Sequence, residues 1–261
     1  MSLDEEIEKC SKIHDNVAEF WNWVYYDTPY REPSSWIVGE YVKQLKPDVE
    51  RRVPVMIREL EGLLGQHPDD SFSILDVGCG VGGCIHKALS LLPEKYPNVK
   101  LKATGIDISS EMIAYASKNL RDSDVELICD SITNSDLKFR NEPFDVAIMM
   151  VTLSFYDDEN AKEILRAIHN KLKRGGCLLV MDFAWTYKWA GLKLFSKPLQ
   201  KLTDMLFSQI LGEPFHFTNR TKDQLEVLLN DAGFKISKSY LTEEKSKMKG
   251  MLVINACVHS G

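Results

Sequence analysis

Long apolar runs are missing from this sequence of 261 residues. No stretch approaches the ~20 apolar residues that a membrane-spanning helix needs. The first residues, MSLDEEIEKC, are acidic and lack the apolar segment of a secretory signal. We therefore expect a cytoplasmic protein with no integral membrane span.

Positive charge is also scarce. Lys and Arg number 32 against 38 Asp and Glu, which gives a net charge of -6. Affinity for nucleic-acid phosphates comes mainly from clustered Lys and Arg, so this balance disfavours a nucleic-acid partner. The basic runs are short and lie beside acidic residues, and we interpret both as solvated faces: Arg51–Arg52 next to Glu50, and Lys245, Lys247 and Lys249 after Glu243–Glu244.

Metal-binding patterns of cysteine are absent. The six cysteines include no C-x-x-C pair and no Cys/His group with zinc spacing, so no metal site is expected. Cys79, Cys129 and Cys177 fall in or beside segments with the pattern of strands. We expect reduced cysteines that serve as small core residues. Signatures of hydrolases, zinc proteases and P-loop enzymes are missing too, since there is no G-x-S-x-G, no H-E-x-x-H and no P-loop lysine.

Short apolar runs alternate with helical periods from Phe72 onward, the pattern of a parallel sheet wrapped by helices. The apolar stripe of the helix before the fifth strand reaches Leu172, and we expect Gly175 to end that helix in a left-handed conformation. Five strands are predicted, at residues 72–77, 99–107, 125–130, 144–151 and 177–184.

The C-terminal part departs from a purely parallel arrangement. Thr221 and Gln224 form a capping box that predicts a helix. The segments FKISKSYL and GMLVINACV follow as two strands joined by a hairpin, which makes them antiparallel. The expected fold is therefore an α/β, Rossmann-like, doubly wound sheet of seven strands, mostly parallel, with an antiparallel last strand.

One turn carries the strongest signal for a ligand. In DVGCGVGG, Gly78, Gly80 and Gly83 have the G-x-G-x-x-G spacing that brings backbone close to a nucleotide at a helix N-terminus. The spacing alone does not name the nucleotide. Asp76 would repel the pyrophosphate of NAD, whereas it would favour the ammonium and sulfonium of S-adenosylmethionine. The alternative is that Asp76 only holds the turn by accepting backbone hydrogen bonds.

The turn resembles the first motif of class I S-adenosylmethionine-dependent methyltransferases. Four later segments resemble further motifs of that family in the same order, so the resemblance covers residues 72–183, and AGF (232–234) with the closing hairpin fits the family's last two strands. The five segments are ILDVGCGVGG, TGIDIS, ICDSI, FDVAIMMVTLSF and LKRGGCLLVMDF. After the fourth strand the chain reads VTLSFY and lacks the N-P-P-Y type of segment known in family members that methylate amino groups of nucleic acids or protein glutamines.

The resemblance implies a cofactor site for S-adenosylmethionine. Asp107 would hold both ribose hydroxyls, and Asp130 would bond the adenine amino group beside Ile108 and Ser131. Because NAD enzymes also hold the ribose with an acidic residue, Asp107 does not discriminate between the two cofactors. The full expected set is Asp76, Gly78, Cys79, Gly80, Asp107, Ile108, Asp130, Ser131, Met149 and Met150.

Two segments outside the alternating pattern, residues 1–70 and 185–220, hold all five tryptophans. We expect one methyltransferase domain: a core of residues 71–184 and 221–261, a helical N-terminal cap (1–70) and a helical substrate-cap insert (185–220). Aromatic faces can surround a cationic amine or a planar acceptor, whereas FWNWVYYDTPY could instead be a helix packed on the sheet edge. Apolar bulk with lysines in the insert would also suit a peripheral membrane contact. Candidate substrate-binding residues are Trp21, Tyr26, Tyr156 and Trp185.

Methyl transfer from a sulfonium depends chiefly on alignment of the reacting atoms, although an enol, phenol or carbon acceptor benefits from a general base. His216, His14 and Tyr25 are the candidate catalytic residues, against ordinary surface or packing roles. The leading hypothesis is transfer of a methyl group from S-adenosylmethionine to a small molecule. The alternatives are an NAD(P)-dependent oxidoreductase and a non-catalytic methyltransferase-like partner subunit.

Overall fold

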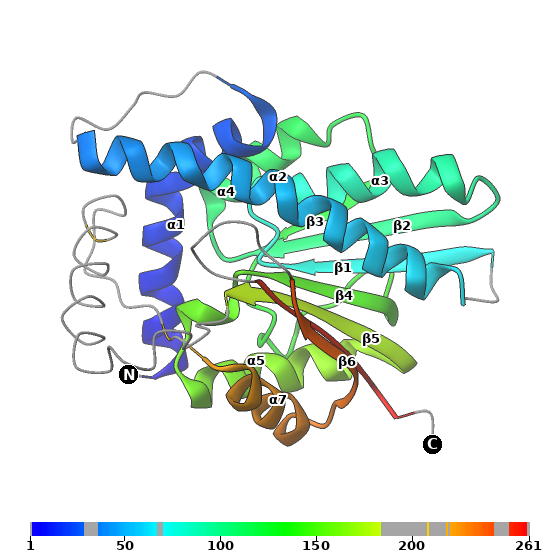
Figure 1. Cartoon of the computed structure of the whole chain (residues 1–261). Helices are drawn as coiled ribbons and strands as arrows, with labels where there is room; N and C mark the ends of the chain where they lie inside the picture. Colours follow the sequence, from blue (N-terminus) through cyan, green and yellow to red (C-terminus); the bar gives the residue numbers. More distant parts are fainter. Residues whose placement is uncertain are drawn as a thin grey trace.

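The computed structural model describes residues 2–28, 36–66, 70–183, 208, 218, 220–242 and 251–259, with the side chains of 36–48 and 183 left out. Within these ranges one seven-stranded sheet carries helices on both faces (Figure 1). The helices are α1 (Leu3–Tyr26), α2 (Trp36–Leu64), α3 (Gly83–Lys95), α4 (Ser110–Asn119), the short 3-10 turn η1 (Leu153–Phe155), α5 (Asp158–Lys171) and α7 (Lys222–Asp231). None of these helices combines the length and the apolarity needed to cross a bilayer.

The strands follow the order β3-β2-β1-β4-β5-β7-β6. β7 is antiparallel to both of its neighbours, and the other adjacent pairs are parallel. The prediction of a mostly parallel, Rossmann-like sheet with an antiparallel last strand is therefore confirmed. The bounds are β1 (Ser71–Val77), β2 (Lys100–Asp107), β3 (Val125–Cys129), β4 (Phe144–Met150), β5 (Leu172–Phe183), β6 (Lys235–Leu241) and β7 (Met251–Cys257).

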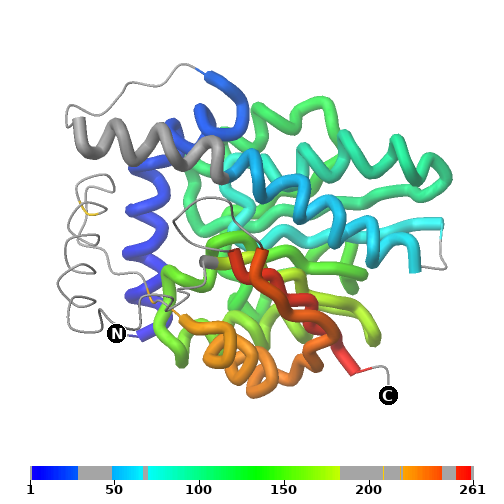
Figure 2. Tube along the Cα trace, in the orientation of Figure 1, coloured from blue at the N-terminus to red at the C-terminus, as the bar shows by residue number. Residues whose placement is uncertain are grey.

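The direction of strand order reverses at β1. The chain moves outward from β1 to β3 and then returns to place β4 on the other side of β1. Ligands of open α/β sheets bind at such a switch point, outside the carboxyl ends of the strands. Helix α1 runs across these strand ends in Figures 1 and 2, so the topology directs attention to the space beneath α1.

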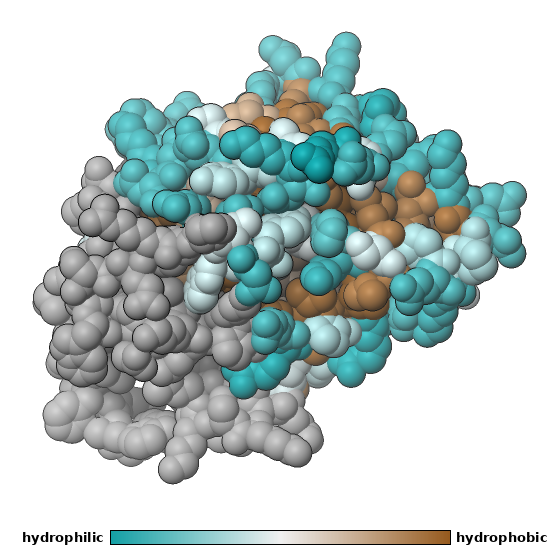
Figure 3. All heavy atoms as spheres, turned by 90° about the horizontal axis from the view of Figure 1, so that it is seen from above, coloured by the Kyte–Doolittle hydropathy of each residue, from teal (hydrophilic) through white to brown (hydrophobic). Residues whose placement is uncertain are grey.

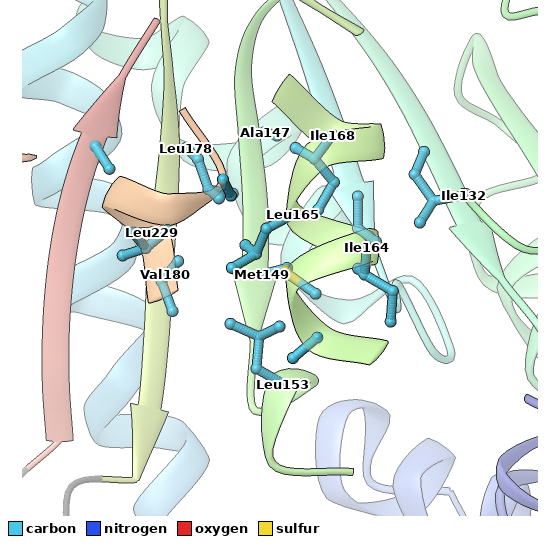
Figure 4. Packing of buried hydrophobic residues seen from close by; sticks show 14 of the residues in the cluster. Ile132, Ala147, Met149, Leu153, Ile164, Leu165, Ile168, Leu178, Val180 and Leu229 are labelled. Atoms are coloured by element: carbon cyan, nitrogen blue, oxygen red, sulfur yellow. The ribbon is translucent and has the colours of Figure 1, made fainter. Parts of the chain in front are cut away.

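Alternating side chains fill the two faces of the sheet. Leu75 and its equivalents on β4, β5 and β7 belong to the cluster packed under α5 and α7, whereas Ile74 belongs to the cluster under α2 and α3. This is the two-residue period of a sheet that is covered on both sides. Figure 4 shows the first cluster, in which residues of α5 lie over β4 and β5: Ile164, Leu165 and Ile168 against Ala147, Met149, Leu178 and Val180.

The predicted end of α5 is wrong. The helix ends at Lys171, and Leu172 already pairs with Phe144 at the start of β5. Between Leu172 and Cys177 the register shifts, so the intervening residues form a bulge opposite β4. Gly175 is left-handed as expected, with φ 77°, but it turns the bulge rather than ending the helix. The predicted capping box of Thr221 and Gln224 is confirmed at the start of α7.

The cysteine prediction is also wrong in part. Cys177 and Cys257 stand opposite each other on β5 and β7 and form a disulfide across 80 residues of chain. Cys129 has a free thiol, but it is exposed at the end of β3 rather than buried. Cys79 is free and buried as expected. Local sequence could not reveal the disulfide, because the two cysteines meet only through the pairing of β5 with β7.

A buried carboxylate joins α2 to the edge of the sheet. Glu59 is 4% exposed and accepts hydrogen bonds from Lys238 Nζ (2.9 Å), Tyr240 Oη (2.6 Å) and Asn255 Nδ2 (2.8 Å). Burial raises the pKa of Glu59, but these hydrogen bonds outweigh burial and hold the pKa below its ordinary value. Figure 3 shows the surface above α2, where hydrophilic residues surround smaller hydrophobic patches. Glu59 therefore lies on the buried side of α2, where its neighbours on the helix are mainly apolar.

Replacing Glu59 by glutamine should lower the free energy of unfolding by roughly 1–3 kcal/mol at pH 7, because the hydrogen bonds lose their charged acceptor. A lowered pKa stabilises the folded state above the unfolded pKa of ~4.3, and this stabilisation disappears as the pH falls through the folded pKa. The difference in the free energy of unfolding between the native protein and the Glu59→Gln variant, measured in urea, should therefore be smaller at pH 4 than at pH 7. Glu50→Gln, an exposed change on the same helix, is the control; a gap independent of pH would contradict the prediction.

Candidate active site

A cavity opens beneath α1 at the carboxyl ends of β1, β2, β3 and β4. Its walls come from the loop after β1, the ends of β2 and β4, helices α1 and α2, and the turn η1. The lining residues used below are His14, Phe20, Trp21, Tyr25, Val49, Arg52, Gly78, Cys79, Gly80, Asp107, Ile108, Met112, Asp130, Ser131, Ile132, Met150, Val151, Thr152, Phe155 and Tyr156. The described residues contain no group of three or more His, Cys, Asp or Glu side chains placed to hold a metal ion.

The glycine loop is folded tightly against its neighbours. Gly78 has φ 73°, and a Cβ on this residue would lie 2.6 Å from Oγ1 of Thr152, so a larger residue would be excluded both by conformation and by space. The N–H groups of Gly78 and Cys79 donate to the carbonyl of Ile106 (2.9 and 3.1 Å). At Gly78 the predicted turn thus brings backbone to the cavity wall without room for a side chain.

Asp107, at the end of β2, is fixed by the backbone around it. Oδ2 accepts from the N–H of Gly80 (2.8 Å) and Oδ1 from the N–H of Ser109 (2.9 Å). Burial raises the pKa of Asp107, while the nearby His14 and the two N–H donors lower it. Each oxygen retains acceptor capacity beyond one backbone bond. The carboxylate is therefore oriented into the cavity and can accept hydroxyl hydrogen bonds.

Asp76 differs from Asp107 in its surroundings. It is 1% exposed, lies behind the wall at the end of β1, and its Oδ2 has no hydrogen-bond partner within the described residues. Burial, with a smaller effect of Asp107, raises its pKa to about 7. A buried carboxylate oxygen without a donor favours a cationic ligand group. The alternative was that Asp76 only accepts hydrogen bonds from backbone N–H groups of the turn. Its Oδ2 accepts none from the described residues.

The ends of β3 and β4 complete the two sides of the cavity. Asp130 accepts from the N–H of Ser131 (2.7 Å) and from Nδ2 of Asn134 (2.8 Å), and both Asp130 and Ser131 line the wall. On β4, Met150 lines the cavity, whereas Met149 points to the opposite face and packs under α5 (Figure 4). Val151 has φ 56°, a conformation that is costly for a β-branched residue; such strained residues cluster at functional sites.

Helix α1 is tied over the cavity by polar contacts. Ser11 Oγ donates to the carbonyl of Ile108 (3.0 Å), and Asp15 Oδ1 accepts from Ser109 Oγ (2.6 Å) and from the N–H of Glu111 (3.1 Å). Asp15 thereby joins α1 to the first turn of α4, where a carboxylate is favourable. These contacts hold α1 against the strand ends where the cavity opens.

The three candidate catalytic residues differ in where the structure places them. His14 lies beside Asp107, with its ring 4.5 Å from that of Phe155, and burial lowers its pKa against the opposing effect of Asp107. Tyr25 Oη lies 3.9 Å from Sγ of Cys84 and 3.9 Å from Sδ of Met150, and burial raises its pKa, so its phenol stays protonated. His216 lies outside the described residues.

The candidate substrate-binding residues divide in the same way. Trp21 and Tyr156 line the cavity. Tyr26 does not; its ring lies against His86, with 5.4 Å between centroids. Trp185 lies outside the described residues.

One lining residue was missed. Arg52 was interpreted as part of a solvated face, yet it is 6% exposed and belongs to the cavity wall. Only Arg51 of that pair is exposed. The available signal was helical spacing, because Arg52 shares a face of α2 with Val49, Val53 and Met56.

Residues 74–176 match a family of methyltransferase domains. O-methyltransferase 3 of Dictyostelium discoideum is 25% identical over 186 residues, which cover 69% of this chain and 40% of the relative. Carboxy-S-adenosyl-L-methionine synthase of a Psychrobacter species is 30% identical over 189 residues, which cover 65% of this chain and 64% of the relative. The chain thus spans less than two thirds of the length of these relatives.

A solved structure with the same architecture is magnesium protoporphyrin IX methyltransferase of Synechocystis with bound SAH. The two chains superpose with a TM-score of 0.67 at 16% identity, over 97% of this chain and 99% of the other. Identity this low supports the fold alone, while the matched family covers the glycine loop and the ends of β2, β3 and β4. Residues 74–176 and the sheet around them thus have the sequence and the fold of a class I S-adenosylmethionine-dependent methyltransferase domain.

Proposed function

We propose that this chain transfers a methyl group from S-adenosylmethionine to a small-molecule acceptor bound in the cavity beneath α1. The observation that carries the proposal is the buried, unpartnered Oδ2 of Asp76, within the described residues, beside a glycine loop and the oriented carboxylate of Asp107. A nucleoside with a cationic group would offer positive charge to Asp76 and ribose hydroxyls to Asp107. The pyrophosphate of NAD would instead add negative charge beside Asp76.

Different residues of the cavity would bind different parts of the cofactor. Asp107 would accept from the ribose hydroxyls, Asp130 with Ile108 and Ser131 would receive the adenine, and Asp76 would hold the ammonium. S-adenosylmethionine supplies an activated methyl group on a sulfonium when bound. Tyr25 and Met150 border the region near Asp76 and would exclude water there.

The acceptor side is proposed from the aromatic wall. Phe20, Trp21 and Tyr156 offer flat apolar surface, which suits an apolar or planar small molecule. His14 lines this cavity and burial lowers its pKa, so it is the candidate base for an acceptor that must lose a proton. We further propose that the chain is one methyltransferase domain, with residues 1–70 as its N-terminal cap; the substrate cap assigned to residues 185–220 lies almost entirely outside the described residues.

Calorimetric titration with S-adenosylmethionine, S-adenosylhomocysteine and NAD tests the cofactor. The first two should bind and NAD should not; tight NAD binding without response to the others would favour the oxidoreductase alternative. A labelled-methyl assay against a metabolite extract then separates an enzyme from a non-catalytic subunit, which would bind cofactor without labelling any product.

Asp107→Ala should weaken S-adenosylmethionine binding by roughly 10- to 100-fold, because two hydroxyl hydrogen bonds to a charged group are lost. The exposed Asp122, in the turn after α4, provides the control Asp122→Ala, which should leave the dissociation constant unchanged. Unchanged binding by the Asp107 variant, with its fold verified by circular dichroism, would show that the ribose lies elsewhere.

A further inference from the structure

The turn η1 lies between a strained residue and the wall of the cavity. It follows Val151, whose φ of 56° is costly for a β-branched side chain. Two backbone hydrogen bonds of 3.2 Å close the turn, and its N-cap, Thr152, makes no capping bond with its side chain. A strained backbone keeps its conformation only where the surrounding structure holds it. The shape of η1 therefore depends on contacts from outside the turn.

Ser154, in the middle of η1, is held from two sides. Its side chain is 6% exposed, and its Oγ donates to Oδ1 of Asp182 at the end of β5 (2.7 Å). Its carbonyl accepts from the N–H of Thr218 (2.9 Å). In the interior, away from water, such hydrogen bonds are stronger than at the surface. Ser154 thus joins η1 to the sheet, separately from Arg220, which donates to other carbonyls of this region.

The residue after Ser154 contacts the candidate base. The ring centroids of Phe155 and His14 lie 4.5 Å apart. Nδ1 of His14 is buried and has no partner with hydrogen-bond geometry within the described residues. A histidine that transfers protons is commonly oriented by a hydrogen bond of its second nitrogen. Because Nδ1 lacks such a bond here, packing against Phe155 is what sets the orientation of the His14 ring.

We propose that Ser154 is a positioning residue for the acceptor side of the site: its bond to Asp182 fixes η1, and η1 holds His14 through Phe155. The inference rests on the proposed function and deepens it, because it assigns the orientation of the candidate base to a residue behind the cavity wall. The proposed cofactor subsite lies on other elements, the loop after β1 and the ends of β2 and β3. Loss of the Ser154 bond should therefore disturb the acceptor side and leave cofactor affinity unchanged.

NMR of the protein with ¹³C-labelled histidine rings, followed over pH, tests the position of His14. The signal of His14 is assigned by its absence from His14→Gln. In Ser154→Ala the pKa of His14 should rise by about half a unit or more toward its ordinary value of ~6.5, because the burial that lowers it is relaxed. Asp107 and Asp15 also face His14, and their charges are the same in both proteins. Ser154→Thr, which keeps the hydroxyl, should keep the native pKa.

Ser73→Ala is the matched control. Ser73 is 5% exposed, and its Oγ donates to Oδ2 of Asp145 (2.7 Å) near the amino end of β1, away from the cavity. This variant should leave the pKa of His14 as in the native protein. Should Ser154→Ala fold poorly, Asp182→Asn weakens the same bond by removing the charge of the acceptor and should raise the pKa of His14 in the same direction.

Activity and cofactor binding give the second readout. Transfer of labelled methyl groups to a metabolite extract should fall about fivefold or more in Ser154→Ala, and by less than about twofold in Ser73→Ala, because misalignment affects the transfer itself. Calorimetry with S-adenosylhomocysteine should give the same dissociation constant for the native protein and both variants.

The proposal is overturned if Ser154→Ala leaves the pKa of His14 as in the native protein, or if Ser73→Ala changes this pKa and the methyl transfer by as much. A loss of S-adenosylhomocysteine affinity that matches the loss of activity would also overturn it, because Ser154 would then act on the whole site. Failure of the native protein to bind S-adenosylmethionine or to label any product would instead overturn the proposed function, and the pKa of His14 would still test Ser154.

Discussion

Replacing Asp76 by asparagine is expected to stabilise the ligand-free protein while it weakens cofactor binding. The pKa of Asp76 rises from 3.8 to about 7 on folding, so the ionised carboxylate destabilises the folded state. At ~1.4 kcal/mol per unit, a shift of about three units amounts to about 4 kcal/mol above pH 7. This penalty is absent below the unfolded pKa and grows as the pH rises toward 7, so the advantage of the asparagine variant should be greater at pH 8 than at pH 5.

Thermal unfolding without ligand, at pH 5 and pH 8, measures the first effect, and calorimetry with S-adenosylmethionine measures the second. Loss of the charge opposite the ammonium should weaken binding about 10- to 100-fold. Asp145 is the matched control, because this buried carboxylate accepts from Ser73 N (2.8 Å) and Ser73 Oγ (2.7 Å) and pairs with Lys173 (2.7 Å). Asp145→Asn should destabilise the protein; destabilisation by Asp76→Asn at pH 8 as well would refute the account of Asp76.

Replacing Arg220 by alanine is expected to destabilise the protein by roughly 2–5 kcal/mol and to loosen one wall of the cavity. The buried guanidinium donates to the carbonyls of Leu153 (2.8 Å) and Tyr156 (2.8 Å) and pairs with Asp158 (2.8 Å). These contacts hold η1 and the start of α5, which carry Phe155 and Tyr156 into the wall. Without the guanidinium, the carbonyl of Tyr156 loses this donor, and the carbonyl of Leu153 keeps the N–H of Tyr156 (3.2 Å).

Urea unfolding measures the loss of stability, and S-adenosylmethionine titration measures the effect on the site. Arg220→Lys should recover little, because one ammonium cannot reach three acceptors held in a planar fork. Lys222→Ala, which removes a partly exposed i,i+4 pair with Glu226, should change stability by less than ~0.5 kcal/mol. If the Arg220→Ala protein is as stable as the Lys222→Ala protein, the contacts of Arg220 are not needed to hold η1 in place.

The sequence predicts those parts of the molecule that depend on neighbours in the chain. Glycine spacing and Asp76 predict the loop after β1, and strand periodicity predicts all seven strands. The spatial order of the strands was not predicted, because the pairing of parallel strands leaves no pattern in the local sequence. The position of Asp107 between Gly80 and Ser109 then follows from the pairing of β1 with β2.

Residues whose roles depend on tertiary packing escaped prediction. Arg52 and Glu59 lie on one helix, and a charged residue in a helical sequence usually faces water. Their burial is decided by what packs on α2, namely β6 and β7 for Glu59 and α1 for Arg52. Leu172 continues the period of α5 and yet joins β5, because its pairing with Phe144 on β4 overrides the local pattern.

The placement of β7 between β5 and β6 has a consequence for synthesis of the chain. β6 precedes β7 in sequence, yet its one strand neighbour in the described sheet is β7. While residues 251–257 remain within the ribosome, β6 has no strand with which to pair, and the outer edge of β5 stays open. The sheet from β3 to β5 can assemble during translation, but this side of it closes only when β7 inserts between two strands that are already made.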